Sequence, residues 1–373
     1  MTPPPGETAR SAKTTPARRP TIKDIARRAG VSESAVSFAL NGRPGVSQGT
    51  RDRIHRVAEE LGWQPNSAAR ALSGERAGCV GLVLARPAHT LGVESFFLQL
   101  VSGVQEVLAS RKVALLFQVV EDIDAECELH RRWWAEKRVD GVLVVDPRAH
   151  DPRPALLASL GLPAVVIGAP ASGEEAAALS TVWADDSAAM ASVLAHLHGL
   201  GHRRVVHVAG LPGLAHTERR ISSLRTEAAH LGLADIRSVT TDYSDAEGAE
   251  ATRRILDEPG PPTAIIYDND VMAVAGASVA AERGIAVPAE LSIVAWDDSA
   301  LCRVTHPRLT ALVRDTSGFG RLAAQELLDR LDGGPVRSIQ AELPHLEPRE
   351  STAPPPGTGT ATATAAPTPR STA

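Results

Sequence analysis

The chain has 373 residues, of which 43% are hydrophobic and 3% aromatic, and its formal net charge is −5. This length accommodates two or three domains with aliphatic cores. The three cysteines, Cys79, Cys127 and Cys302, are too few and too widely spaced for a disulfide framework or a zinc site, so they favour a reducing, cytoplasmic location. No apolar stretch reaches the roughly 18 residues of a membrane span, which excludes a membrane-spanning protein.

The charge is distributed unevenly along the chain. Residues 10–76 contain 13 Arg and Lys residues against 6 Asp and Glu residues, so the remainder is acidic. A basic N-terminal block on an acidic body suits a nucleic-acid partner, although a basic run is more often just a solvated surface. Residues 1–19 are rich in Pro, Thr, Ala and Arg and lack the apolar segment of a signal peptide, so we expect a disordered arm.

Three short helices are expected between residues 20 and 64. The first runs from about Ile22 to Ala29, because Thr21 and Asp24 have the spacing of a capping box and Gly30 suits the turn that follows. Apolar residues at helical spacing predict a second helix over residues 32–41 and a third over residues 48–61. Helix, tight turn and helix is the arrangement that presents a second helix to the DNA major groove. The alternative is an unrelated three-helix bundle.

A fourth, very short helix is expected just after this unit. Asn66 has the right position to cap the segment from Ser67 to Leu72. Seven residues are too few for a helix to be stable alone in water, so this helix needs a partner, and DNA is a plausible one.

Residues 21–72 resemble the DNA-binding headpiece and hinge helix of the LacI/GalR family of transcriptional regulators. The run "GVSESAVSFALNGRPGVS" carries the likeness to the family's recognition helix and the turn after it, and a looser resemblance extends over residues 21–352. It implies a homodimer on palindromic operator DNA, a headpiece over residues 20–64, and a hinge helix and linker over residues 65–76. The residues expected to contact DNA are Thr21, Ser32, Glu33, Ser34, Ser37, Phe38, Asn41, Arg51, Asn66 and Leu72.

Two of these residues have alternative explanations. Phe38 stands where arginine is frequent in the family, and it can pack on a thymine methyl group or belong to the headpiece core. Leu72 matches the leucine that family members insert into the minor groove, and the alternative is that it packs the hinge against the core.

From Cys79 onward, short β-branched runs alternate with longer amphipathic segments. This alternation predicts βαβ units with parallel, doubly wound sheets, and about 270 residues suggests two such lobes with a ligand cleft between them. Strands are expected at residues 80–85, 113–120, 141–145, 164–168, 205–209, 263–267 and 291–295. Helices are expected at residues 96–111, 124–137, 186–200 and 270–283.

The family resemblance makes this core periplasmic-binding-protein-like and places it at residues 77–348. It implies an N-terminal lobe of residues 79–202 and 297–315, a C-terminal lobe of residues 203–296 and 316–348, and three crossover segments. Residues 349–373 are rich in Thr, Ala, Pro and Gly, so we expect a disordered tail. Its lack of leucine heptads offers no coiled coil for building tetramers.

The resemblance also implies a small-molecule effector, a sugar or sugar-like compound, bound between the lobes. The residues that match the family's effector contacts are Phe96, Phe97, Asp185, Arg220, Tyr243 and Asp270. Such a set is chemically coherent, because carboxylates and arginine bond to vicinal hydroxyls while aromatic faces pack on a sugar ring. Alternatives remain for Phe97 in the core, for Arg220 in a surface ion pair and for Asp270 as a helix cap.

Three departures from the family pattern lie near these positions. Glu94-Ser95 replaces the usual Asn-Pro, Asp186 stands where asparagine is usual, and Ser222-Ser223 follows Arg220 in place of a small residue and glycine.

No catalytic residue, cofactor or metal site is expected. The sequence contains no dinucleotide-binding fingerprint, no Walker loop and no nucleophile elbow, and its twelve histidines do not pair at metal-ligand spacing. We therefore expect a transcriptional regulator, most simply a repressor, rather than an enzyme. The alternatives are an extracytoplasmic solute-binding protein of the same core fold and, more remotely, an enzyme.

Overall fold

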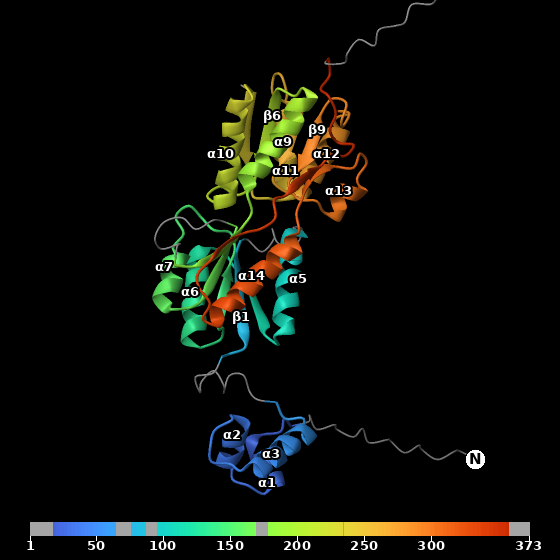
Figure 1. Ribbon diagram of the computed structural model, residues 1–373. Coiled ribbons are helices and arrows are strands. Elements are labelled where there is room, and N and C mark those ends of the chain that lie inside the picture. Colours follow the sequence, from blue (N-terminus) through green and yellow to red (C-terminus); the bar gives the residue numbers. More distant parts are fainter. Residues whose placement is uncertain (1–17, 65–75, 87–94, 169–177, 234, 358–373) are drawn as a thin grey trace, which may run out of the picture. The chain divides into compact units, whose positions relative to one another are not determined.

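The computed structural model describes residues 18–64, 76–86, 95–168, 178–233 and 235–357 (Figure 1). The expectations for Asn66, the hinge helix and Leu72 lie outside these residues. Internal contacts divide the chain into two compact units, residues 1–73 and residues 74–373. We describe each unit by itself.

The first unit is a three-helix headpiece of α1 (Ile22–Ala29), α2 (Glu33–Leu40) and α3 (Gln48–Glu60). Its core contains Ile25, Val36 and Ile54, none of which is exposed. The Asp24 carboxylate accepts hydrogen bonds from the Thr21 amide at 2.9 Å and the Thr21 hydroxyl at 2.7 Å. These local interactions explain why the three helices form where sequence periodicity predicts them.

The second unit contains two six-stranded sheets with the same winding. The first has the order β11-β5-β4-β3-β1-β2 and is parallel throughout. Its strands are β1 (Cys79–Ala85), β2 (Ala114–Val120), β3 (Gly141–Val144), β4 (Ala164–Ile167), β5 (Ser180–Trp183) and β11 (Ser338–Gln340). The second has the order β12-β10-β9-β8-β6-β7, with only β12 antiparallel. Its strands are β6 (Arg204–Ala209), β7 (Asp235–Thr240), β8 (Ala264–Tyr267), β9 (Ser292–Ala295), β10 (Thr310–Val313) and β12 (His345–Glu347).

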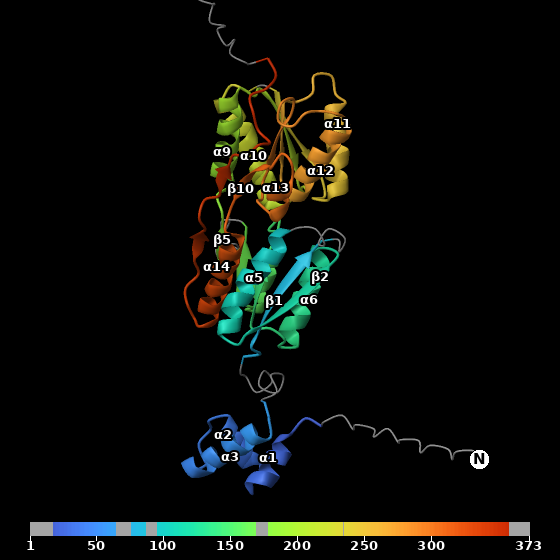
Figure 2. The same cartoon turned by 90° about the vertical axis from the view of Figure 1, so that its right-hand side faces the viewer.

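Helices cover both faces of each sheet, which makes each lobe a three-layer sandwich. On the first sheet, α5 (Ser95–Ser110) and α14 (Thr316–Leu331) cover one face, and α6 (Ile123–Ala135) and α7 (Arg153–Leu160) cover the other (Figure 1). On the second sheet, α9 (Asp186–Leu200) and α10 (Ala215–His230) lie opposite α11 (Asp245–Leu256), α12 (Asp270–Glu282) and α13 (Ala300–Val304) (Figure 2). The predicted α/β architecture of two doubly wound lobes is therefore confirmed.

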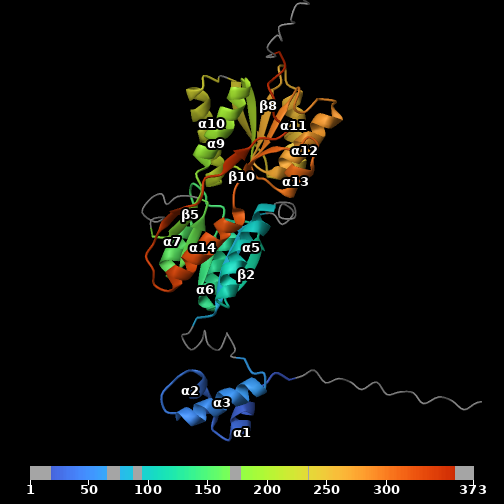
Figure 3. The ribbon, with the colours of Figure 1, turned by 45° about the vertical axis from the view of Figure 1, so that its right-hand side comes forward.

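The assignment of the last elements to the lobes differs from the expectation. Residues 297–315 were expected in the first lobe, but β10 pairs with β9 in the second sheet. Residues 316–348 were expected in the second lobe, but α14 packs on α5 and β11 pairs with β5, whereas β12 returns to the second sheet (Figure 3). α9, expected in the first lobe, belongs to the apolar cluster of the second. The chain thus changes sheet after β5, after β10 and after β11.

The close packing of α14 on α5 depends on glycine. A Cβ atom at Gly320 would lie 2.2 Å from the Leu100 carbonyl oxygen, which is far inside contact distance. The helices therefore approach closely at this point, and the docking of α14 closes the apolar core of the first lobe.

The core extends beyond residue 348, where we expected a disordered tail to begin. Ser351 is fully buried, and its hydroxyl donates to the Ile293 carbonyl at 2.6 Å and accepts from the Thr310 amide at 2.8 Å. The Ala353 carbonyl accepts from His202 at 2.9 Å. These polar contacts hold residues 349–353 along the second sheet, which composition alone does not reveal. Within the described residues, none of the helices is long and apolar enough to cross a membrane.

Candidate functional site

The second helix of the headpiece presents a polar outer face. Ser32, Glu33 and Ser34 are exposed, Ser37 is half-buried, and the opposite face of α2 buries Val36 and Ala39 in the core. The Ser32 hydroxyl caps the helix by accepting from the Ala35 amide at 3.1 Å. The helix terminus therefore carries several hydroxyl groups at the surface.

Phe38 extends this face with an apolar group that is 39% exposed. One edge of its ring faces the turn, where a Cβ atom at Gly45 would lie 3.5 Å from Phe38 Cδ2. Phe38 thus lies at the surface of the headpiece, with one ring edge against the turn and the rest exposed to solvent. Asn41 is exposed at the end of α2, and Thr21 is exposed at the start of α1.

Arg51 has a structural task that sequence reasoning missed. Its guanidinium donates to the Ala39 carbonyl at 2.7 Å and to the Arg43 carbonyl at 2.8 Å, so it ties α3 to the end of α2 and the turn beyond. The expectation that Arg51 contacts DNA stays a prediction. Arg53 and Arg56 are exposed and form no ion pair with other described residues.

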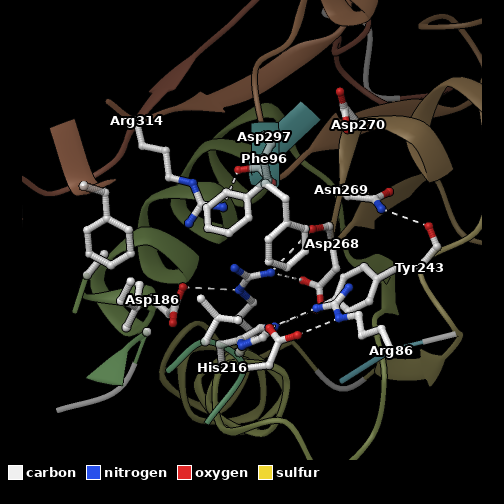
Figure 4. Close-up of a pocket in the computed structure, with 18 residues that line it drawn as sticks. Arg86, Phe96, Asp186, His216, Tyr243, Asp268, Asn269, Asp270, Asp297 and Arg314 are labelled. Carbon is white, nitrogen blue, oxygen red and sulfur yellow. Dashed lines mark hydrogen bonds and ion pairs between the residues drawn. The ribbon is translucent and has the colours of Figure 1, made fainter. Parts of the chain in front are cut away.

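A pocket lies where the carboxyl ends of the two sheets face each other in the second unit (Figure 4). Each sheet changes winding direction at one point, between β1 and β3 in the first and between β6 and β8 in the second. Ligands of doubly wound folds bind beyond such points. Arg86 and Asp146 follow β1 and β3, and Asp268 follows β8. The pocket has about 720 Å³ of space between atoms, including the part open to solvent.

Arg220 occupies the centre of the pocket and is fully engaged. Its Nε lies 3.3 Å from Asp186 Oδ1, its Nη1 lies 3.1 Å from Asp268 Oδ1, and its plane stacks on Trp296 with 4.2 Å to the ring centre. Burial alone would lower the pKa of Arg220, but the carboxylates of Asp268 and Asp186 raise it. Arg220 is therefore a permanent, buried cation, and the alternative of a surface ion pair is excluded.

Asp268 is the other centre of this network. Its carboxylate accepts from His207 Nε2 at 2.9 Å and from the Gly210 amide at 2.9 Å. Burial opposes ionisation, yet Arg220 and His207 lower the pKa of Asp268. Asp268 thus stays ionised and fixes the position of the Arg220 guanidinium.

A second arginine of the pocket, Arg86, lies between the aromatic rings of Phe97 and Tyr243. Arg86 forms an ion pair with Asp146, with Nε to Oδ2 at 2.6 Å. Its guanidinium carbon is 5.1 Å from the ring centre of Phe97 and 5.0 Å from that of Tyr243. Because Phe97 belongs to the first lobe and Tyr243 to the second, this cation joins the two lobes across the pocket.

Tyr243 is held rigidly against the pocket. Its hydroxyl is 2.9 Å from His216 Nε2 and 3.2 Å from Thr217 Oγ1, and the ring lies directly over Gly210, where a Cβ atom would be 1.7 Å from Tyr243 Cζ. Burial, with a contribution from Arg220, lowers the pKa of His216 to about 4, so this histidine is neutral near pH 7. The phenol and the imidazole therefore act as neutral hydrogen-bonding groups.

Asp270 lines the pocket, and the N-cap of its helix is the preceding residue, Asn269. Asn269 caps α12 by accepting from the Met272 amide at 2.8 Å, while Asp270 is 2% exposed and accepts from Ser95 at 3.4 Å. On the same side, Asp297 pairs with Arg314 at 2.6 Å, and Arg314 stacks on Phe96 at 4.5 Å. Among the described residues, the buried Nε of Arg314 has no hydrogen-bond partner.

Five of the six expected effector residues line this pocket, namely Phe96, Phe97, Arg220, Tyr243 and Asp270. The sixth, Asp185, is not among the lining residues, because its carboxylate turns to cap α9 by accepting from the amides of Ser187 and Ala188 at 3.0 Å. The neighbouring Asp186, the residue that departs from the family pattern, lines the pocket instead.

Sequence reasoning missed a further group of lining residues, namely Arg86, Asp146, His216, Asp268, Asp297 and Arg314. Most share a readable signal, since Arg86, Asp146, Asp268, Asp297 and Arg314 are charged residues one or two positions after an expected or observed strand. Charged residues at that position meet at one edge of a parallel sheet. His216 lies on α10 and carries no such signal.

The chemistry of the site is that of binding. Three arginines, five aspartates and four aromatic rings converge, and these lining residues include no nucleophile activated by a base. Across the residues described here, no group of three or more His, Cys, Asp or Glu side chains could hold a metal ion.

Comparisons with known families match both units. Residues 21–66 match the family described as bacterial regulatory proteins, lacI family, and residues 194–352 match the periplasmic binding protein-like domain. The HTH-type transcriptional regulator CelR of Thermobifida fusca is 31% identical over 340 residues, which cover 90% of this chain and 98% of that protein. Catabolite control protein A of Priestia megaterium is 28% identical, covering 89% and 99%.

Solved structures give the same picture. A LacI family transcriptional regulator from Bifidobacterium animalis subsp. lactis is 36% identical, with a TM-score of 0.68, over 75% of this chain and 100% of that one. The complex of the transcriptional regulator CelR with cellobiose is 29% identical, with a TM-score of 0.66, over 89% and 100%. The lac repressor dimer bound to operator and an anti-inducer has a TM-score of 0.77 over 90% and 100%, and at 23% identity it shows the shared fold.

Proposed function

Because this chain belongs to the lacI family and is a DNA-binding transcriptional regulator, we propose that it is a repressor whose operator affinity is set by a sugar bound between its two lobes. Its relatives are regulators rather than enzymes. CelR has been solved with cellobiose, which makes a sugar the natural class of ligand to propose here.

The pocket is the observation that carries the proposal. It combines aromatic faces from Phe96, Phe97 and Tyr243 with the buried carboxylate of Asp270 and the guanidinium of Arg220. Vicinal hydroxyls both donate and accept, so they suit carboxylates and arginine together, and the C–H face of a sugar ring suits an aromatic wall. The buried Nε of Arg314 would also gain a partner from such a ligand.

The exposed face of α2 supports the DNA-binding half of the proposal. We assign base contacts to Ser37, Phe38 and the hydroxyls at the start of α2, and phosphate contacts to Arg53 and Arg56. One headpiece covers a half-site, so two copies of the chain on a palindromic operator give the simplest arrangement.

The two lobes provide the element on which a ligand would act. They are already in contact across the pocket, since Arg219 of α10 donates to the Gly168 carbonyl at 2.6 Å and Ser95 contacts Asp270. A ligand that bonds to both lobes stabilises their closed arrangement only by its differential affinity for the closed and open states. A coupling of about 1–3 kcal/mol changes operator affinity about 5–150-fold.

The proposal is tested in two steps with the full-length chain. A thermal-shift screen of neutral mono- and disaccharides identifies a ligand, because a compound at about 100 times its Kd adds roughly 2.7 kcal/mol of stability. Fluorescence anisotropy with labelled DNA from upstream of the gene that encodes this protein then measures operator affinity with and without that ligand. The proposal fails if no sugar stabilises the protein, or if a bound sugar leaves operator affinity unchanged.

A further inference from the structure

We infer that the pocket selects against anionic ligands, so that the effector carries no phosphate and no carboxylate. This inference rests on the proposed effector site and restricts its ligand class. Three arginines in one pocket would by themselves suggest the opposite, since guanidinium groups are common binders of phosphate and carboxylate. The pairing of those arginines decides the matter.

Each lining arginine already faces a carboxylate of the protein. Arg86 is bonded to Asp146 at 2.6 and 3.0 Å. Arg220 lies between Asp186 and Asp268 at 3.3 and 3.1 Å. The aspartates therefore neutralise the positive charge of these two arginines, and an anionic ligand would have to compete with those fixed, buried carboxylates.

The third arginine is neutralised in the same way. Arg314 is paired with Asp297 at 2.6 Å and stacked on Phe96. Its Nε hydrogen is left without a partner, so Arg314 can donate one hydrogen bond to a ligand oxygen without offering a net charge. That combination suits a hydroxyl or ring oxygen better than an anion.

Carboxylates remain in excess after this pairing. Five aspartates and three arginines line the pocket, while Arg219 and His207 contact Asp186 and Asp268 from outside the lining. The surplus is localised at Asp270, whose side-chain partners among the described residues are Ser95 and its own helix amide rather than a cation. Burial raises the pKa of Asp297; the nearby Asp270 carboxylate adds to this shift, while Arg314 and Arg220 oppose it.

The two segments that follow β1 and β4 in sequence lie outside the described residues, but their composition points the same way. Residues 87–94 and 169–177 contain Glu94, Glu174 and Glu175 and neither lysine nor arginine. Apart from His89, nothing in them can carry a positive charge.

The expected size of the effect follows from Coulomb's law. An anionic group about 6 Å from one unbalanced carboxylate, at an effective dielectric constant of about 20, binds on the order of a hundred-fold more weakly than its neutral counterpart. The partner that suits Asp270 is a pair of ligand hydroxyls, which donate to it without adding charge.

The test uses the full chain and matched pairs of probes in a thermal-shift and calorimetric titration. The pairs are glucose with glucose 6-phosphate and with glucuronate, ribose with ribose 5-phosphate, and cellobiose with cellobionate. We expect at least one neutral sugar to bind and its anionic partner to bind at least ten-fold more weakly. An anionic member that binds as tightly as its neutral parent overturns the inference while keeping a sugar effector. Binding of no member in any pair removes both the sugar effector and the inference.

Two variants locate the selection at the pocket. Asp270→Asn removes the unbalanced charge and keeps the shape, so the ratio between neutral and anionic affinities should fall on the order of a hundred-fold. Asp235→Asn is the matched control, because Asp235 is exposed at the start of β7, at the opposite end of the same lobe's sheet. An equal change of the ratio in both variants would mean that long-range net charge, rather than the pocket, discriminates.

Discussion

Arg153 gives the sharpest test of how the pocket wall is held. It is 2% exposed, and all five of its N–H groups have acceptors. Two reach Asp151, at 2.9 and 2.7 Å, one reaches Glu126 at 2.9 Å, and two reach the carbonyls of Val145 and Asp146, both at 2.9 Å. Asp146 has φ = 53°, a left-handed conformation that needs such support, and its side chain holds Arg86 in the pocket.

Replacing this arginine with methionine should destabilise the protein severely. Arg153→Met leaves Glu126, which is fully buried, and Asp151 without their cation. Breaking a buried pair from one side costs about 3–5 kcal/mol, a large part of a total stability of roughly 5–15 kcal/mol. In the folded variant, the freed Asp146 loop should also weaken effector binding.

The stability lost in Arg153→Met should increase with pH. Burial raises the pKa of Glu126 from 4.5 to about 7 even though Arg153 opposes this shift. The unfolded chain therefore releases this proton first, and Glu126 lowers stability progressively as pH rises from about 4.5 to about 7. Without Arg153 the folded pKa rises further, so the decline continues above pH 7 and the gap between variant and wild type widens towards pH 9.

Urea unfolding followed by circular dichroism at pH 6 and pH 8.5 measures these differences. Glu126→Gln alone should flatten the pH dependence between pH 5 and 7. The double variant Glu126→Gln with Arg153→Met should be more stable at pH 8.5 than Arg153→Met, because it removes the unpaired charge. Two results at pH 8.5 would refute this account. One is a free energy of unfolding of Arg153→Met within about 1 kcal/mol of wild type, and the other is a double variant no more stable than Arg153→Met.

Three further predictions concern DNA and effector binding. Asp270→Ala should leave operator affinity unchanged and abolish its response to the effector, because each ligand hydroxyl left unpaired costs roughly 1–3 kcal/mol. Anisotropy titrations with and without effector measure both properties, and a variant that binds the effector as tightly as wild type would contradict this prediction. Phe38→Ala should weaken binding mainly at operators with an A·T pair at the contacted position, measured across operator variants, and a uniform loss would contradict a base contact. Arg51→Met should lower the melting temperature of the headpiece and weaken all operators alike, since it frees the carbonyls of Ala39 and Arg43; a selective loss at one base pair would assign Arg51 to base reading.

Much of the candidate site was accessible from the sequence, but its electrostatics was not. Residues such as Phe97, Arg220 and Asp270 could be proposed because they match the effector contacts of the family that the sequence resembles. Which aspartate lines the pocket depends on one turn of backbone. Asp185 accepts hydrogen bonds from the first amides of α9, and Asp186 forms the ion pair with Arg220. The positions of two adjacent aspartates in the sequence do not reveal which of them takes which role. The intramolecular contacts of Arg51 could not be predicted for a similar reason, since its acceptors lie at the end of α2 and in the turn beyond it. Its expected contact with DNA stays a prediction.

The sequence by itself determined the local elements of this protein. Caps, apolar periods of 3.6 and buried β-branched runs act over neighbouring residues, so the three headpiece helices and the alternating α/β core follow from them. Only the tertiary structure decided where β10, α14 and residues 349–353 belong, because each gains its partners from segments distant in sequence. It alone also decided that the pocket's arginines are neutralised, since Arg220 finds Asp186 and Asp268 only when two sheets bring their carboxyl ends together. Ion pairs depend on distances in space, and sequence separation carries almost no information about them.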